Sequence, residues 1–162
     1  MEIRKYKEGD SFDAISRVYA MSWKVAYCQI VPQRYLDELS EVRWAPLMQK
    51  EKDRLLLVID GGEIIGAATY GAAREKNYAG WGEIVSLYLL PAYYRKGIGS
   101  RLLQRAAKEL ANLGFDQIYL WVLRENQAAR RFYEANGFRC SGDRITCEIG
   151  GKPLEEIRYV FD

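Results

Sequence analysis

A segment near the middle of the chain, residues 83–103, contains residue types that could bind an anion. An apolar run is followed by a short loop with Arg95, Lys96, Gly97 and Gly99, and then by a helical pattern. Free N–H groups at a helix start and the helix dipole attract phosphate-type anions, and glycines let the backbone approach such a ligand closely. A plain loop with helix-capping glycines would have the same pattern, so both interpretations stay open on this segment alone.

This loop matches neither of two common nucleotide-binding motifs. A P-loop needs Gly-Lys-Ser/Thr after four variable residues, and no such sequence follows the first glycine. The dinucleotide fingerprint needs a third glycine where this chain has Leu102. A small transferase that binds nucleotide phosphates in another way stays as an alternative, although the chain lacks the metal-ligand and lysine motifs of such enzymes.

The chain contains no histidine, which excludes Ser-His and Cys-His catalysis and argues against a zinc site. Its three cysteines, Cys28, Cys140 and Cys147, are odd in number and lack Cys-x-x-Cys spacing. We therefore expect reduced thiols rather than disulfides. Any acid–base chemistry must come from Asp, Glu, Tyr, Lys or Cys side chains.

A second motif lies in residues 124–138, directly after the next predicted strand. From Asn126 to Phe138 it reads Asn-x-x-Ala-x-x-Phe-Tyr-x-x-x-Gly-Phe. Together with the glycine loop it resembles the acetyl-CoA site of the GNAT N-acetyltransferase superfamily, whose loop is usually Gln/Arg-x-x-Gly-x-Gly/Ala. The resemblance covers residues 55–138 well. One departure is Tyr94, which occupies the position of the family's Gln or Arg.

The resemblance implies a single N-acetyltransferase domain over residues 1–162. It implies an α/β fold of the GNAT type, with a central mixed, mostly antiparallel sheet of about seven strands and helices on both faces. The implied reaction moves the acetyl group of acetyl-CoA to a primary amine by direct attack in a ternary complex, without a metal. The alternative within this fold is a non-catalytic domain that senses acyl-CoA.

The resemblance also implies a set of cofactor contacts. The pantetheine arm would pair like an added strand with backbone groups of Leu87, Tyr88 and Leu89. The pyrophosphate would lie on backbone amides of the glycine loop. These amides belong to Arg95, Lys96, Gly97, Ile98, Gly99 and Ser100.

The second motif would contact the other side of the pantetheine arm through Asn126, Ala129 and Phe132. Asn126 has a second interpretation, as the N-cap of the helix that follows it, and both roles can hold together.

Two residues are candidates for proton transfer. Tyr133 matches the family's general acid: the departing CoA thiolate needs a proton, which a phenol with a pKa near 10 can supply. Glu83 stands fourteen residues before Gly97, where some family members have a glutamate that accepts the amine's proton directly or through water. The alternatives are a packing role for Tyr133, and for Glu83 a solvated position or a charge partner of the substrate.

The acceptor is predicted to be a small-molecule amine or a protein amino group. Aromatic residues make up 13% of the chain, which favours a small cleft with aromatic walls over an open groove. Acceptor contacts are predicted for Trp23, Tyr27, Trp81 and Trp121, with Tyr35 and Tyr119 as further aromatic residues that could reach the cleft. Core packing is the alternative for each of these side chains.

Hydrophobic periodicity predicts the elements that must position these residues. Strands are predicted at residues 2–6, 55–59, 64–70, 83–90, 117–123, 138–149 and 154–161. Helices are predicted at residues 12–23, after Pro32, at 41–49, at 98–113 and at 126–136, with Asp10 or Ser11 capping the first and Gly114 ending the fourth. This order is typical of a mixed sheet with helices on both faces.

Length and charge exclude some partners. A chain of 162 residues fits one domain, and 24 Lys and Arg against 22 Asp and Glu give a net charge of +2. This balance argues against a nucleic-acid partner, and no apolar stretch is long enough to span a bilayer. We expect a cytoplasmic protein without nucleic-acid or membrane partners, and the resemblance allows a homodimer.

Overall fold

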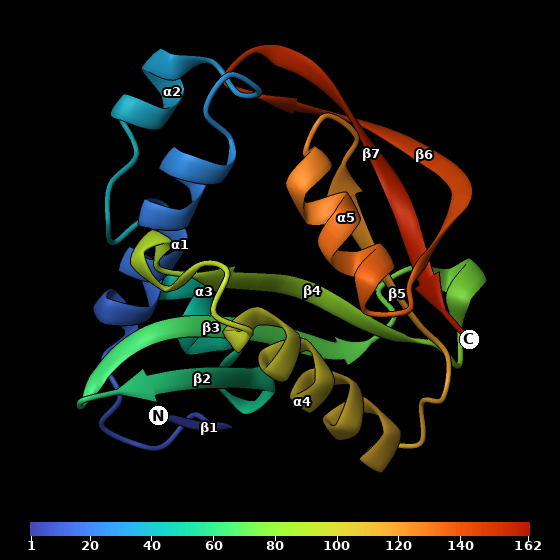
Figure 1. The fold of residues 1–162 in the computed structure, drawn as a ribbon, viewed down its shortest axis with the longest axis horizontal. Helices are drawn as coiled ribbons and strands as arrows, with labels where there is room; N and C mark the ends of the chain where they lie inside the picture. The colour runs from blue at the N-terminus through green and yellow to red at the C-terminus, as the bar shows by residue number, and fades with distance from the viewer.

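The computed structural model describes all 162 residues and contains one seven-stranded sheet in the order β1-β2-β3-β4-β5-β7-β6 (Figure 1). The strands are β1 (Glu2–Lys5), β2 (Leu55–Asp60), β3 (Glu63–Ala72), β4 (Gly82–Leu89), β5 (Ile118–Leu123), β6 (Arg139–Ile149) and β7 (Lys152–Phe161). Only β4 and β5 pair in parallel, and all other neighbours are antiparallel. The predicted fold class, a mixed and mostly antiparallel sheet, is confirmed.

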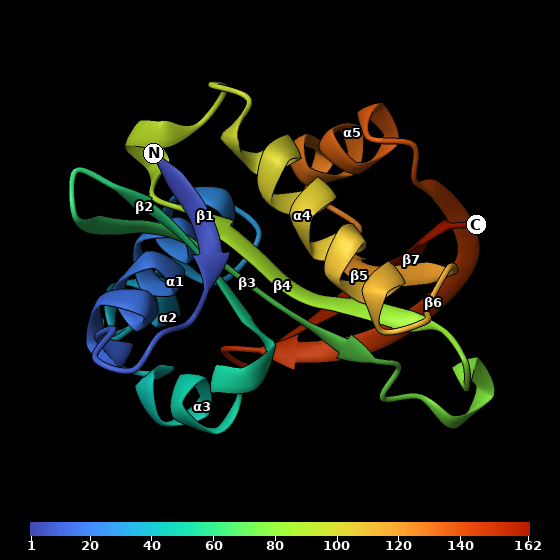
Figure 2. The same ribbon diagram turned by 90° about the horizontal axis from the view of Figure 1, so that it is seen from below.

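Helices cover both faces of this sheet, with α4 on the side of β3 and β4 opposite to α1 (Figure 2). The five α-helices are α1 (Phe12–Ala26), α2 (Gln33–Asp37), α3 (Ala45–Lys50), α4 (Ile98–Asn112) and α5 (Gln127–Ala135). The third helix begins at Ala45, not at residue 41 as predicted. Pro46 explains the difference, because proline fits the first turn of a helix and disrupts its interior.

The predicted capping residues set the helix ends. Ser11 Oγ accepts a hydrogen bond from Ala14 N at 3.1 Å and begins α1. Asn126 Oδ1 accepts one from Ala129 N at 3.2 Å and begins α5. Gly114, with φ of +93°, follows the last turn of α4 in the left-handed conformation that glycine adopts without strain.

Alternate residues of the central strands fill the two faces of the sheet. Leu55, Leu57 and Ala67 pack against Ile15 and Tyr19 of α1.

None of the helices has the length and apolar character that crossing a bilayer requires.

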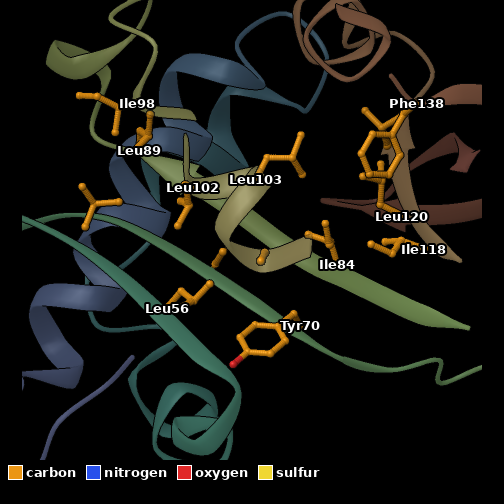
Figure 3. Close-up of a cluster of buried hydrophobic side chains, with 14 of the residues drawn as sticks. Leu56, Tyr70, Ile84, Leu89, Ile98, Leu102, Leu103, Ile118, Leu120 and Phe138 are labelled. Atoms are coloured by element: carbon orange, nitrogen blue, oxygen red, sulfur yellow. The ribbon is translucent and has the colours of Figure 1, made fainter. Parts of the chain in front are cut away.

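The opposite face packs against α4. Leu102 and Leu103 of this helix contact a cluster that includes Leu56, Ile84 and Leu120 (Figure 3). Each fully buried leucine stabilises the fold by about 1.5–3 kcal/mol. This packing fixes α4 against the sheet and therefore fixes the loop that precedes it.

β4 and β5 stay together over only two residue pairs, Gly82 with Ile118 and Glu83 with Tyr119. After these pairs, β4 remains bonded to β3 while β5 remains bonded to β7 along its whole length. The two strands therefore separate. We call the space between Ile84–Leu89 of β4 and Leu120–Leu123 of β5 the wedge.

Candidate active site

A cavity of about 1130 Å³ occupies the wedge. Its walls are completed by α5, by the loop before α4 and by the end of α1. Many of the predicted site residues line it: Trp23, Tyr27, Glu83, Leu87, Tyr88, Leu89, Arg95, Gly97, Gly99, Ser100, Trp121, Asn126, Ala129, Phe132 and Tyr133. The fold therefore brings the two sequence motifs to one place.

Two residues of the glycine loop do not turn their side chains into the cavity. Lys96 Nζ lies 5.3 Å from the centroid of the Tyr93 ring. The Ile98 side chain is buried in the core with α4. Both were predicted to act through their backbone amides, so their side-chain positions leave that prediction open.

Three of the aromatic residues lie away from the cavity lining. Trp81 packs edge-to-face on Tyr78, with ring centroids 5.1 Å apart. Tyr35 packs against Gly150, and Tyr119 is fully buried within the sheet. The structure therefore brings Trp23, Tyr27 and Trp121 to the cavity but not Trp81.

The start of α4 presents amides that have no partner within the helix. Gly97 occupies the N-cap with φ of +77° and supplies no side-chain acceptor. Arg101 N is the first amide to bond back, to Gly97 O at 3.2 Å. The N–H groups of the first turn, at residues 98–100, are therefore free to hold an anion.

Gly99 is needed for packing as well as for any ligand. A Cβ at this position would lie 3.2 Å from a ring carbon of Phe132, so the missing side chain lets α5 approach α4 closely. The sequence pattern alone explained this glycine by the approach of a ligand or by helix capping, and not by the packing of α5.

The edge of β4 that faces the wedge is unpaired. Leu90 N donates to Ile65 O at 2.8 Å, so Leu90 belongs to a hydrogen-bonded pair with β3. In an antiparallel ladder such pairs alternate, which turns the backbone groups of Leu87 and Leu89 away from β3 and toward the wedge. An extended ligand could pair with them as an added strand.

Tyr88 connects this edge to the aromatic wall of the cavity. Its ring packs on Tyr19 with centroids 4.7 Å apart, and its hydroxyl lies 3.2 Å from the hydroxyl of Tyr27. Trp23 packs edge-to-face on Tyr27 at 4.8 Å. The end of α1 therefore contributes a continuous aromatic surface to the cavity.

Tyr133 points a phenol into the cavity from α5. Its ring packs among Phe132, Phe138 and Tyr159, with centroid distances of 5.1, 5.9 and 6.4 Å. The hydroxyl forms no hydrogen bond with the protein. Burial, and then the neighbouring Tyr88 hydroxyl, raise the pKa of Tyr133 well above its ordinary value, so the phenol keeps its proton at neutral pH.

Glu83 is 1% exposed and accepts four hydrogen bonds. Arg74 donates three of them, from N at 3.2 Å, Nε at 3.0 Å and Nη2 at 2.6 Å, and Tyr119 Oη donates the fourth at 3.0 Å. Burial alone would raise the pKa of Glu83, but the Arg74 contacts outweigh it and hold that pKa below its usual value. The carboxylate is therefore ionised, weakly basic and saturated with donors, and its role as a base stays a prediction.

A second buried ionic group fixes the loop that carries Arg74. Arg158 is 5% exposed, and its guanidinium lies 3.6 Å from the Tyr78 ring centroid and 4.4 Å from that of Trp121. Glu75 accepts hydrogen bonds from Arg158 Nη2 at 3.1 Å and from Trp121 Nε1 at 3.2 Å. These contacts hold the loop between β3 and β4 against β5 and β7.

Glu156 is a cavity carboxylate that sequence reasoning missed. It lies on β7, opposite Leu123 of β5 and Ile145 of β6, and it is half-buried. It forms no hydrogen bond or ion pair. Burial raises its pKa above the usual value, against a smaller opposing effect of Arg74.

β7 places Glu156 and the ring of Tyr133 on opposite faces of the sheet. Tyr159 packs on Tyr133, whereas Glu156 stands three residues earlier and so points to the other face. Leu154 shares the face of Glu156 and packs in one cluster with Trp23. The wedge is the opening that connects the two faces.

The sequence pattern of the Acetyltransferase (GNAT) family matches residues 15–138, which include both β4 and α5. The chain belongs to this family. The expectation drawn from the glycine loop and the Asn-x-x-Ala-x-x-Phe-Tyr motif is therefore confirmed, and the protein is an N-acetyltransferase.

Several relatives of this GNAT chain are themselves acetyltransferases. An uncharacterized N-acetyltransferase of Bacillus subtilis, YuaI, is 29% identical over 96% of this chain and 89% of its own. A spermidine N(1)-acetyltransferase of Thermoplasma acidophilum is 28% identical over 86% of this chain and 88% of its own. The crystal structure of PaiA N-acetyltransferase from Thermoplasma acidophilum, in complex with coenzyme A, matches with a TM-score of 0.72 at 27% identity and covers 96% of each chain.

Tyr94 takes a structural role at the position where the GNAT loop usually has Gln or Arg. Its hydroxyl lies 3.0 Å from Ser22 Oγ, which links the loop before α4 to α1. The side chain lines the cavity and carries no positive charge. An anion at this loop would therefore have the backbone amides of the loop, and not the Tyr94 side chain, as hydrogen-bond donors.

The sequence contained a weak signal for Glu156. Period-two alternation in β7 puts this residue on the same face as Leu154, which is an inward position for a charged side chain. The signal was incomplete, because only the pairing of β7 with β5 shows that this face opens into the wedge.

Ser100→Asp tests the anion site. An aspartate in the first turn favours the helix, so the fold should hold, while its charge should repel a pyrophosphate on the same amides. We expect the Kd for acetyl-CoA to rise at least tenfold, about 1.4 kcal/mol, in calorimetry. Ser100→Asn has the size of the aspartate variant without its charge, and it should bind acetyl-CoA nearly as the wild type does. Unchanged affinity in folded Ser100→Asp would place the pyrophosphate elsewhere.

Glu83→Gln tests the buried ion pair through stability. The pKa of Glu83 is lower in the folded chain, so its ionised form stabilises the fold above the unfolded pKa of about 4.3 and this contribution is lost as the pH falls through the folded pKa. We expect Glu83→Gln to lower the free energy of unfolding by roughly 1–3 kcal/mol at pH 7. The deficit should shrink in acid, as measured by urea unfolding at several pH values. A deficit that stays constant down to strongly acidic pH would contradict the assignment.

Proposed function

We propose that this acetyltransferase takes the acetyl group from acetyl-CoA and transfers it to a primary amine by direct attack in a ternary complex. The wedge is the observation that carries the proposal. Along it lie the unpaired edge of β4, the free amides of α4 and the unbonded phenol of Tyr133. A CoA thioester bound along these groups would have its carbonyl beside Tyr133.

The coenzyme A complex of the related PaiA protein supports a CoA thioester as the donor. In our proposal the amide groups of pantetheine pair with the backbone of Leu87 and Leu89 as an added strand, while the backbone of Tyr88 faces β3. The pyrophosphate lies on the amides of residues 95–100 at the start of α4. Asn126, Ala129 and Phe132 contact the arm from α5.

The two open faces of the wedge support direct attack. Donor groups and Tyr133 occupy the side of α5, while the aromatic wall from α1 and the Glu156 carboxylate occupy the other. An acceptor entering from that second side could reach the thioester carbonyl while CoA is still bound. Direct transfer therefore requires no acetylated enzyme intermediate.

Tyr133 acts as the general acid in this mechanism. When the amine attacks the carbonyl carbon and the C–S bond breaks, the leaving thiolate takes the phenolic proton. The raised pKa of Tyr133 keeps the proton in place until the thiolate forms. Because the hydroxyl has no protein partner, it is free to bond to sulfur.

A base is also needed, because an ammonium has no lone pair with which to attack. Glu83 is the candidate from the sequence, and its use would require Arg74 to release part of the carboxylate. Glu156 also lines the cavity, and unlike Glu83 its carboxylate has no hydrogen-bond partner. The choice between them determines how the acceptor is held.

A small cationic amine fits the acceptor side of the cavity. Tyr27 and Trp23 offer aromatic surface and Glu156 offers a negative charge, the two features that bind an alkylammonium. One relative is a spermidine N(1)-acetyltransferase, which supports an alkylamine as the acceptor class.

Tyr133→Phe tests the acid. The variant keeps the ring packing and removes the proton, so acetyl-CoA affinity should stay within twofold while kcat falls roughly 100-fold, about 2.7 kcal/mol. Thiol release in the presence of a primary amine measures kcat, and calorimetry measures the affinity. A kcat within about threefold of the wild type would reduce Tyr133 to a packing residue.

Thiol release from acetyl-CoA with a panel of amines, including spermidine and benzylamine, tests the function itself. We expect turnover with at least one primary amine, and thermal stabilisation by acetyl-CoA but not by ATP. Stabilisation by acetyl-CoA without turnover of any amine would instead favour the acyl-CoA sensor.

A further inference from the structure

We propose that Glu156 is the residue that receives the acceptor's ammonium group and removes its proton. The inference rests on the proposed transfer to a primary amine and names the chemical class of the acceptor, an alkylamine that is protonated at neutral pH. It makes Glu156 a catalytic residue and leaves Glu83 as a positioning residue, which acts by holding Arg74.

The pairing of the strands places Glu156 at the acceptor side of the wedge. Its partner across β5 is Leu123, the last residue of that strand, where the separation from β4 has become wide. Leu123 and Leu154 pack with Trp23 and Tyr27 in one cluster. The end of α1 therefore covers the same face on which Glu156 stands.

Glu156 differs from the other two cavity carboxylates in having no partner. Glu83 accepts four hydrogen bonds, and Glu75 accepts one each from Trp121 and Arg158. Glu156 accepts none, although it is half-buried. Even partial burial of a carboxylate without a donor is destabilising, and an ammonium ligand would supply the missing donors.

The charged and titratable groups around Glu156 come from every neighbouring element. Arg74 approaches from the loop after β3, Tyr27 from α1, Tyr88 from β4 and Cys147 from β6. Arg74 is already held by both oxygens of Glu83, and the other three groups are neutral at pH 7. Arg158, two residues further along the same face of β7, is paired with Glu75, so no cation neutralises Glu156 by direct contact.

This environment also makes Glu156 the better proton acceptor of the two glutamates. Burial raises the pKa of Glu156, whereas the Arg74 contacts hold the pKa of Glu83 below its usual value despite burial. A base works best when its pKa lies close to the operating pH. Glu156 moves toward this condition and Glu83 moves away from it.

Tyr27 and Tyr88 line the same cavity as the proposed base and the acid. Burial is the main cause of the raised pKa of Tyr27, and Tyr88, Tyr133 and Glu156 each raise it further. Tyr27 is thus within electrostatic range of both groups. Its ring and that of Tyr88 can contact the alkyl chain and the cation of the acceptor.

In the proposed reaction each proton has a defined donor and acceptor. The acceptor ammonium gives one proton to a Glu156 oxygen, and the freed nitrogen lone pair forms the C–N bond at the thioester carbonyl. The C–S bond then breaks, and Tyr133 gives its proton to the sulfur. The nitrogen's second proton returns to the Tyr133 phenolate as the amide forms, and Glu156 releases its proton to water.

Glu156→Gln tests the inference, with Glu155→Gln as the matched control. Glu155 is the adjacent residue on the other face of β7, where it pairs with Arg124 at 2.8 Å. With spermidine or benzylamine at pH 7, we expect Glu156→Gln to lower kcat/KM roughly 100-fold or more, and Glu155→Gln to stay within about threefold. The Kd for acetyl-CoA should stay within twofold in both variants.

Two further readouts separate proton removal from a structural role. Wild-type kcat/KM should rise with pH as Glu156 ionises. In Glu156→Gln, kcat/KM should instead follow the fraction of acceptor that is already a free amine, so that the difference from the wild type becomes small at high pH. Trifluoroethylamine, which is largely neutral at pH 7, should lose less than about tenfold in the variant because it needs no base.

These experiments distinguish a failure of the proposed amine acetylation from a failure of the role given to Glu156. If the wild type acetylates no amine, the proposed function fails and the inference fails with it. If the wild type is active and Glu156→Gln keeps kcat/KM within threefold, or loses as much with trifluoroethylamine as with spermidine, only the inference is overturned. If kcat/KM of Glu156→Gln rises with pH as in the wild type, and this rise is absent in Glu83→Gln, the base is Glu83.

Discussion

The parallel contact between β4 and β5 is limited to two residue pairs, and the rest of the site depends on this limit. β3 holds β4 on both sides of a β-bulge at Val85, and β7 holds β5 along its whole length, so neither strand can bend back to close the gap. The result is an internal sheet edge with unpaired backbone groups inside the protein. In most proteins such an edge would have to be covered. Here a ligand with peptide-like amides can cover it.

The polar groups around the wedge fall into two sets, those in ion pairs within the protein and those without a partner. Arg74 is paired with Glu83, and Arg158 with Glu75, and these ion pairs hold the loop between β3 and β4 in place. The amides of α4, the phenol of Tyr133 and the carboxylate of Glu156 are left without partners. These three groups match a pyrophosphate, a leaving thiolate and an ammonium, in that order.

Local features could be predicted from the sequence, and features set by strand pairing could not. The loop from Arg95 to Ser100, the Asn126 cap and most element boundaries follow from patterns within one segment, and Tyr133 follows from the resemblance of its segment to the GNAT motif. Trp81 stands beside the predicted base in sequence, yet the turn before β4 directs its ring onto Tyr78. Glu156 needed the register of β7 on β5 to be recognised. Glu83 was found as a site residue, but its saturation by Arg74 depends on the path of a loop.

Amide hydrogen exchange along β4 with and without acetyl-CoA tests most directly whether the cofactor occupies the wedge. The N–H groups of Leu87 and Leu89 face this space, whereas Leu90 N is already bonded to Ile65. Acetyl-CoA should slow exchange at Leu87 or Leu89 at least tenfold, because each new hydrogen bond must open before exchange occurs. Leu90 should change little. Binding of acetyl-CoA that leaves both wedge-facing amides unchanged, while protecting amides elsewhere, would contradict a cofactor held as an added strand between β4 and β5.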